Sequence, residues 1–149
     1  MLSKTGIHAL TALSSLTSLP EGVYVGAGEL AEQIGAPPNY LGKLLKTLAD
    51  EGIVESQKGK GGGFRLARNP ATVSLLEVVE PIEHFSRWSG CFLGQPRCSD
   101  QTACAVHYRW KEVRDRYLRF LKETTIADLA GRGASASAAR PALPAGTAC

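Results

Sequence analysis

PPNYLGKLLKTLADEGIVESQKGKGGGFRLAR, residues 37–68, carries the strongest structural pattern in the chain. Its first half predicts a helix over 39–50, because four leucines at i, i+3, i+4 and i+7 make one narrow apolar stripe. These are Leu41, Leu44, Leu45 and Leu48. The opposite face is polar and cationic, and it carries Asn39, Gly42, Lys43 and Lys46.

A second helix precedes this one across a tight turn. Residues 29–34 have apolar positions at helical spacing, Gly35 is placed to end the helix, and residues 36–38, APP, supply the turn. Two short helices, the second with a basic outer face, are typical of a helix-turn-helix. On these residues alone, an amphipathic surface helix with solvated lysines is an equal alternative.

The second half of the stretch predicts a β-hairpin. Residues 53–57 and 64–67 have strand-like composition, and KGKGGG at 58–63 joins them. Directly after a helix-turn-helix, such a hairpin is a wing whose glycines let the backbone approach phosphates or a minor groove. The alternatives are a flexible linker and a P-loop, which lacks the required Gly-Lys-Ser/Thr. The residues predicted to contact DNA are Pro38, Asn39, Tyr40, Lys43, Lys46, Lys58, Lys60, Gly61 and Gly62.

The flanking segments complete a winged helix-turn-helix domain over 1–80. Residues 3–18 predict a helix with a broad apolar face and Ser3 as its N-cap, and 23–25 are expected to form a short strand. Ser74 and Glu77 make a capping box that begins a further short helix, which is expected to stop near Pro81. The predicted fold is therefore mainly α, with a small β-hairpin wing.

A cluster of thiols follows this domain. Cys91, Cys98, Cys104 and His107 are separated by six, five and two residues. Three thiolates and an imidazole can fill the tetrahedral shell of zinc, or most of the outer shell of an iron-sulfur cluster. Disulfides are the alternative, but the fourth cysteine, Cys149, is the last residue, and the clustering favours a metal. Residues 81–108 are expected to form the cluster-binding loop.

The C-terminal part predicts a long helix over 105–124 and a short one over 126–130, capped by Thr125. Apolar residues recur at steps of three or four along the long helix, as in a heptad seam. We interpret the seam as the interface of a homodimer; packing inside its own protomer is the alternative. The seam residues are Val106, Trp110, Val113, Tyr117, Phe120 and Leu121. Residues 131–149, rich in Gly, Ala and Pro, predict a disordered tail.

The composition fits one cytoplasmic domain with an arm. The chain has 149 residues, and its 44% hydrophobic content is enough for a packed core. No run is long enough to span a membrane, and the N-terminus lacks the uninterrupted apolar region of a secretory signal. A formal net charge of +3 is too small to indicate nucleic acid by itself, so the position of the basic residues matters.

Together these motifs resemble the IscR/NsrR-type family of winged-helix iron-sulfur transcriptional regulators, over residues 1 to about 130. The resemblance rests on residues 35–41, LADEGIV at 48–54, KGKGGGFRL at 58–66, SLLEVVE at 74–80 and the cysteine cluster. It implies a homodimer bound to a dyad-symmetric operator in double-stranded DNA. It also implies an iron-sulfur cluster, either 4Fe-4S or, preferred here, 2Fe-2S, held by Cys91, Cys98 and Cys104.

The resemblance implies a fourth ligand as well, and the chain departs from the family at two positions. His107 has the spacing of the histidine ligand in the iron-sulfur regulator. The acidic first-helix ligand of other members corresponds to Ile7, which cannot ligate, and the adjacent His8 is expected to pack or face solvent. A recognition-helix glutamate is replaced by Gly42, which costs about 1 kcal/mol of helix stability. The wing arginine is replaced by Lys58, which keeps the charge but loses the flat fork.

The sequence therefore predicts a DNA-binding transcriptional regulator rather than an enzyme. A cluster that orders the loop would change operator affinity when its own state changes, and so would sense cluster status, nitric oxide or redox stress. One alternative is a winged-helix regulator with a structural zinc site. The other is an iron-sulfur electron-transfer or redox protein, but a winged helix would then have no purpose and no nucleophile-base pair or dinucleotide motif is evident.

Overall fold

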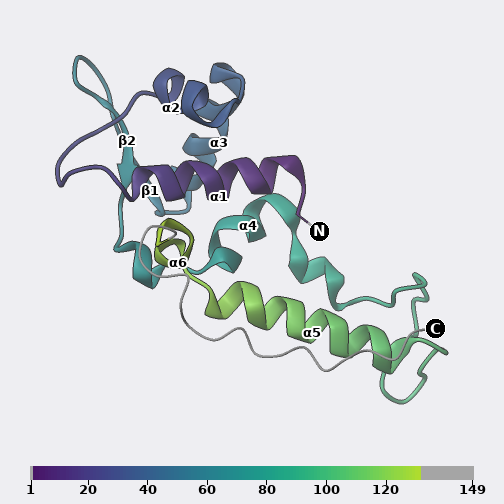
Figure 1. Ribbon diagram of the computed structural model, residues 1–149. Helices are drawn as coiled ribbons and strands as arrows, with labels where there is room; N and C mark the ends of the chain where they lie inside the picture. Colours follow the sequence, from purple (N-terminus) through teal and green to yellow (C-terminus); the bar gives the residue numbers. More distant parts are fainter. Residues whose placement is uncertain (1, 132–149) are drawn as a thin grey trace.

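The computed structural model of the chain describes residues 2–131, except for the side chains of residues 88 and 89. In chain order its elements are α1 (Lys4–Leu16), α2 (Ala27–Ile34), α3 (Pro38–Asp50), β1 (Val54–Gln57), β2 (Gly63–Leu66), η1 (Pro70–Thr72), α4 (Leu75–Glu83), η2 (Phe85–Ser89), α5 (His107–Glu123) and α6 (Ile126–Ala130). Helices α1 to α3 and the hairpin gather at one end of the molecule, and α5 runs away from them toward the cysteine loop (Figure 1). The predicted mainly α fold with a hairpin wing is confirmed.

Helix α1 crosses the middle of the molecule between α3 and α4 (Figure 1). Its N-cap is Ser3, as predicted: the Ser3 Oγ accepts a hydrogen bond from the Gly6 backbone N–H at 3.1 Å. The Glu83 carboxylate, at the end of α4, lies over the same first turn. A Cβ on Gly6 would be 2.5 Å from Glu83 Oε1, so only glycine allows this close approach.

The helix-turn-helix is formed by α2 and α3. Helix α2 ends at Gly35, whose φ of 68° is left-handed, and α3 begins at Pro38, where a proline needs no N–H partner. Both helices start one or two residues earlier than predicted. The leucine stripe is buried as expected and packs into the core, with Leu41, Leu44, Leu45 and Leu48 at most 7% exposed.

The wing is an antiparallel hairpin in which Val54 pairs with Leu66 and Gln57 with Gly63. The predicted strand over 23–25 is reduced to a single bridge: Phe64 N–H donates to the Val25 carbonyl at 2.8 Å, and Val25 N–H donates back at 3.0 Å. At this crossing Gly63 has φ 139°, and a Cβ there would lie 2.3 Å from the Val25 oxygen. The third segment therefore depends on a glycine at 63.

Helix α4 has the predicted capping box, formed by Ser74 and Glu77, but the expectation that it stops near Pro81 is wrong. The helix continues to Glu83, and His84 ends it in the left-handed conformation at φ 55°. Pro81 removes only the hydrogen bond that would reach the Glu77 carbonyl, while the buried Val78 and Val79 continue to hold the helix in the core.

Helix α5 is followed by α6, which Thr125 caps as predicted; the structure adds that Asp128 completes a capping box. The chain around Thr125 pairs with the start of α4. Leu75 N–H donates to the Thr124 carbonyl at 2.9 Å, and Ile126 N–H donates to the Val73 carbonyl at 3.0 Å. These bonds fasten the C-terminal end of α5 to the winged domain.

One prediction for the seam is corrected: Leu121 is only 1% exposed, because its side chain packs into the hydrophobic core of its own protomer. The predicted tail lies outside the described residues except for Gly131, and Cys149 is also outside them. Within residues 2–131, no helix has the length and apolar character needed to cross a membrane.

Candidate metal centre and nucleic-acid interface

The loop between η2 and α5 brings the three cysteines together. The Sγ atoms of Cys91, Cys98 and Cys104 all lie within 4.8 Å of one another, and the Cys91 and Cys104 sulfurs are 3.6 Å apart. All three side chains are half-buried. Residues from three separate turns of the loop therefore converge on one point near the start of α5.

A tight turn places backbone N–H groups around Cys91. Gly94 has φ 70°, its N–H donates to the Cys91 carbonyl at 2.9 Å, and the Leu93 N–H points at the Cys91 sulfur from 3.4 Å. Hydrogen bonding from the Gln95 backbone, followed by that from Leu93, lowers the pKa of Cys91 to about 7 despite partial burial. This thiol is the one prepared to be a thiolate, the form that ligates metals.

The Cys98 thiol has a different electrostatic environment. A backbone hydrogen bond from Cys104 lowers the pKa of Cys98, but burial and the two neighbouring thiols together outweigh it, so the net pKa is raised. Like-charged thiolates cannot all form cheaply at this distance without a cation between them. The three sulfurs therefore suit a positively charged centre.

The structure places His107 at the first position of α5, beside Cys98. Its Nδ1 lies 3.1 Å from the Cys98 sulfur, although the ring is not within 4.8 Å of all three thiols. On the other side, its Nε2 lies 2.9 Å from Asp100 Oδ1. Asp100 also pairs with the Lys111 ammonium at 2.8 Å. The Lys111 hydrogen bond, and then the one from His107, lower the pKa of Asp100.

Sequence reasoning missed Asp100 and Lys111. The available signal was a carboxylate two residues after Cys98 and a lysine one helical turn after His107. The partnership depends on the path of the loop, which spacing alone does not give.

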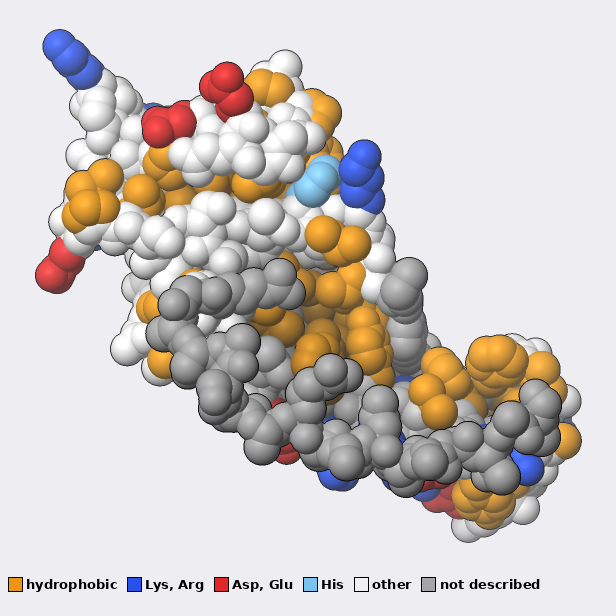
Figure 2. Space-filling model, viewed as in Figure 1, with side chains coloured by type: hydrophobic (Ala, Val, Ile, Leu, Met, Phe, Trp, Pro, Cys, Tyr) orange, Lys and Arg blue, Asp and Glu red, His pale blue; other side chains and the backbone are white. Residues whose placement is uncertain are grey.

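Aromatic side chains pack beside the thiols. The Trp110 indole N–H donates to the Gly90 carbonyl at 3.3 Å, and its ring lies 5.3 Å from that of Phe92. Phe92 and Leu93 are 64% and 56% exposed, and hydrophobic side chains crowd this end of the molecule in Figure 2. The loop thus carries an apolar outer surface next to the candidate centre.

The donor set fits the predicted group. Cysteine thiolates hold iron-sulfur clusters, and a histidine can complete such a shell. The same three sulfurs and one imidazole nitrogen also form a closed zinc set, so the residues alone accommodate either. Ile7 contributes no donor: it is 51% exposed, and an isoleucine cannot ligate.

His8 packs, as expected. Its ring meets that of Tyr40, at the start of α3, edge to face at 5.7 Å. Its Nδ1 atom is buried and has no hydrogen-bond partner among the described residues. His8 therefore connects α1 to the recognition helix rather than serving the thiol cluster.

The predicted DNA contacts lie together on the winged end of the molecule. Most are exposed: Pro38, Asn39, Lys43 and Lys46 on α3, and Lys58, Lys60 and Gly61 on the hairpin turn. Tyr40 and Gly62 are half-buried, and the Gly62 N–H donates to the Gly59 carbonyl at 3.0 Å to close the turn. The hairpin projects well beyond the helices in Figure 1. Its lysines are thus accessible to a phosphate backbone.

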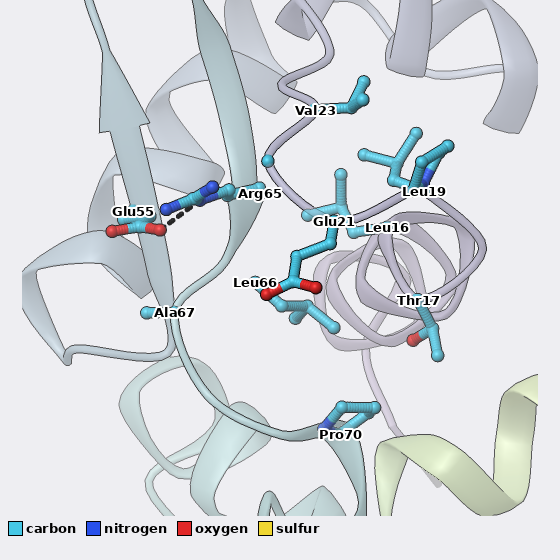
Figure 3. Close-up of a pocket in the computed structure, with 12 residues that line it drawn as sticks. Leu16, Thr17, Leu19, Glu21, Val23, Glu55, Arg65, Leu66, Ala67 and Pro70 are labelled. Atoms are coloured by element: carbon cyan, nitrogen blue, oxygen red, sulfur yellow. Dashed lines mark hydrogen bonds and ion pairs between the residues drawn. The ribbon is translucent and has the colours of Figure 1, made fainter.

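A cavity of about 330 Å³ lies at the base of the wing (Figure 3). There Arg65 pairs with Glu55 on the opposite strand, and its guanidinium lies 4.6 Å from the centre of the Tyr24 ring. The hydrogen bond to Glu55 raises the pKa of Arg65. This arginine is held within the hairpin. Leu16 of α1 and Leu66 of β2 line the same cavity, which therefore lies where the wing meets α1.

The remaining seam residues share one face of α5 and its N-cap but differ in exposure. Val113 and Phe120 are 60% and 54% exposed, whereas Val106, Trp110 and Tyr117 are half-buried. The Tyr117 ring packs against buried Phe85 at 5.7 Å, edge to face, and burial raises its pKa. The exposed residues therefore remain available for a partner, and Tyr117 already serves the protomer.

Comparisons with known proteins agree with this arrangement. An HTH-type transcriptional regulator of Aquifex aeolicus is 33% identical over 131 residues, covering 87% of this chain and 90% of the relative. The regulator IscR of Escherichia coli is 27% identical over 128 residues, covering 86% and 78%.

Two solved structures have the same fold. T. potens IscR superposes with a TM-score of 0.73 at 23% identity, covering 94% of this chain and 93% of that one. CymR, the global cysteine regulator of B. subtilis, gives 0.72 at 22% identity, covering 88% and 96%. The family model for Rrf2, described as iron-dependent transcriptional regulators, matches residues 2–132. With its winged helix and its motif resemblance thus confirmed, the chain belongs to the Rrf2 family and is a transcriptional regulator, not an enzyme.

Proposed function

We propose that this regulator adjusts its affinity for a DNA operator through an iron-sulfur cluster held by Cys91, Cys98, Cys104 and His107. The observation that carries the proposal is the convergence of three thiols within 4.8 Å, with the His107 nitrogen 3.1 Å from one of them. When bound, the cluster supplies a centre whose charge changes on reduction and which nitric oxide or iron loss can destroy. We favour a 2Fe-2S form on the resemblance to IscR.

The protein's own residues would transmit the state of the site along α5. Trp110 connects the first turn of α5 to Gly90 in the cysteine loop. Tyr117, further along α5, packs on Phe85, which precedes that loop in the chain. Without three thiolates fixed in one place, residues 91–106 lose their main restraint, and the N-terminal half of α5 moves with them. A coupling of about 1 to 3 kcal/mol would change operator affinity roughly five- to 150-fold.

In this proposal the protein acts in the cytoplasm, as a homodimer bound to a dyad-symmetric operator in double-stranded DNA. Exposed Val113 and Phe120 supply apolar area on α5 for a second copy. Each copy would then place α3 in a major groove and the Lys58–Gly63 turn on the adjoining backbone or minor groove. A shift of α5 changes the separation of the two recognition helices, to which half-site spacing is sensitive.

A structural zinc site is the second candidate. Three thiolates and one imidazole are a closed tetrahedral set for zinc, with no open position for chemistry. In that case the site would pin the loop, and operator affinity would not respond to redox state.

Anaerobic purification distinguishes the iron-sulfur cluster from the structural zinc site. The cluster proposal expects a coloured protein with iron and sulfide in stoichiometric amounts; a colourless protein with one zinc refutes it. Operator sequences are then selected from random DNA, and the affinity of Cys98→Ser for them is measured. Cys149→Ser is the matched control for the loss of a thiol. We expect Cys98→Ser alone to change operator affinity while the oligomeric state is kept. Equal affinity of both variants for every selected sequence would contradict the coupling.

A further inference from the structure

The His107 ring lies between a thiol and a carboxylate. Its Nδ1 faces the Cys98 sulfur at 3.1 Å, and its Nε2 faces Asp100 Oδ1 at 2.9 Å. The His107 side chain is 15% exposed, whereas that of Asp100 is 61% exposed. The ring is therefore held from both sides in a largely enclosed position.

The chemistry of the carboxylate decides which ring nitrogen carries the hydrogen. An ionised carboxylate only accepts hydrogen bonds, so the short contact to Asp100 requires an N–H at Nε2. In the neutral ring the other nitrogen is then a bare lone pair. That lone pair is on Nδ1, and it points toward the Cys98 sulfur.

Asp100 is itself fixed in place by the first turn of α5. Lys111 donates to both carboxylate oxygens, at 2.9 and 2.8 Å. The Tyr108 hydroxyl donates to the Asp100 backbone carbonyl at 3.0 Å. Together with His107, three side chains from α5 hold this single loop residue. An exposed Asp–Lys pair contributes little to stability by itself. Here the pair orients the Asp100 carboxylate, which in turn orients the His107 ring.

We propose that Asp100 is a positioning residue that holds His107 in its Nε2–H tautomer and so presents Nδ1 as the fourth ligand atom. This inference rests on the proposed metal centre and adds the ligand atom and the residue that selects it. Metal-bound histidines commonly donate their second N–H to a carboxylate, which raises the basicity of the ligand. Lys111 donates to both oxygens of that carboxylate and so fixes its orientation toward the ring.

The ligand atom is tested in the full-length, cluster-loaded protein. Protein is made with histidine that carries ¹⁵N only at Nδ1, and pulsed electron paramagnetic resonance of the reduced cluster reads the coupled nitrogen. We expect the strong coupling to come from ¹⁵N, that is, from Nδ1. Strong coupling to ¹⁴N, or none, overturns the assignment.

The role of Asp100 is tested by a cycle with His107. Asp100→Asn removes a negative charge but leaves an acceptor oxygen for Nε2–H, so we expect nitrogen ligation to persist while the midpoint potential rises. Asp100→Ala should lose or exchange the coupled nitrogen. In a His107→Ala background, Asp100→Asn should leave the potential unchanged. An equal shift in both backgrounds would mean that Asp100 acts only as a nearby charge, which refutes positioning.

The matched control is Glu112→Gln, which removes the same charge from an exposed ion pair with Arg116 on α5. It should leave potential and coupling unchanged; if it reproduces the Asp100→Asn shift, the proposal is wrong. Binding of a probe metal, Co(II), tests the role of Asp100 independently of whether the site holds an iron-sulfur cluster. Retention of Co(II) against a chelator should fall about 10- to 100-fold in Asp100→Ala. If wild type holds no iron-sulfur cluster but Co(II) retention still depends on Asp100, the proposed function fails and the positioning role stands.

Discussion

Glu83 at the end of α4 accepts two hydrogen bonds from Ser3, one from its backbone N–H at 2.8 Å and one from its hydroxyl at 2.6 Å. Ser3 is also the N-cap of α1, so one carboxylate fastens the last turn of α4 to the first turn of α1. A negative charge near a helix N-terminus is favourable in addition. Because the cysteine loop leaves α4 at this end, the contact lies between the candidate sensor and the DNA-binding helices.

Glu83→Ala should lower the free energy of unfolding by about 1 kcal/mol, the usual net value of such hydrogen bonds. It should also reduce the difference in operator affinity between loaded and cluster-free protein, because α1 would no longer follow α4. Urea unfolding and fluorescence anisotropy with a selected operator measure the two effects. Glu83→Gln, which retains an acceptor oxygen, is the control and should lie between wild type and alanine. If Glu83→Ala leaves the affinity difference intact, coupling does not pass through this contact.

In metal-free protein, Cys91 should react faster than Cys98 near neutral pH. Its pKa is lowered to about 7 and that of Cys98 is raised, so the thiolate fraction of Cys91 rises first as pH increases through neutrality. Iodoacetamide labelling followed by peptide mass spectrometry should give a rate for Cys91 with a midpoint near pH 7. The Cys98 rate should still be climbing at higher pH. Indistinguishable pH profiles would show that the turn at Gly94 does not activate Cys91.

The wing lysines should contribute charge rather than sequence selectivity. Replacing Lys58 or Lys60 by Gln should reduce the slope of log affinity against log salt by about 1 each, because each removes one phosphate neutralisation. The loss should be similar for all operator sequences. Lys122→Gln, an exposed lysine in the last turn of α5, is the matched control and should keep the wild-type slope. A salt slope unaffected by the wing substitutions would place the hairpin away from DNA.

Gly63→Ala should destabilise the protein by about 1 to 3 kcal/mol, because φ of 139° is unfavourable for alanine and the new Cβ would meet the Val25 carbonyl. The comparison is Gly42→Ala inside α3, where the added Cβ makes ordinary contact with the Ala27 Cβ at 3.7 Å. That change should stabilise by about 1 kcal/mol through helix propensity. Thermal unfolding at fixed protein concentration measures both, and equal signs would contradict this account of Gly63.

The sequence was a sufficient guide where local rules and burial agree. The leucine stripe predicted α3, Gly35 marked the end of α2, the Ser74 capping box located α4 and the Thr125 cap located α6, because each depends on neighbours within a few residues. Pro81 was misleading because burial of α4 outweighed one lost hydrogen bond. Leu121 fitted the periodicity of a seam, but periodicity does not tell which buried surface a helix face meets.

At the candidate centre, spacing identified the thiols but not their geometry. Three cysteines and a histidine at ligand-like intervals are visible in any reading of residues 91–107. The Asp100 contact to His107 spans seven sequence positions through irregular loop, for which no periodic rule exists. The N–H groups around Cys91 likewise depend on the left-handed turn at Gly94.

The backbone hydrogen bonds of the bridge between Ser74 and Thr125 fix the C-terminal end of α5, so the helix can act as a lever that turns about this end. Its C-terminal end is hydrogen-bonded to the winged domain, and its N-terminal end carries His107 beside the cysteine loop. A helix of this length extends about 25 Å, so tilting it by about 10° moves the far end by about 4 Å. Small rearrangements among the thiols would thereby correspond to a small rotation of α5 about its C-terminal end, and the stiffness of the helix would add to the side-chain contacts that carry the signal.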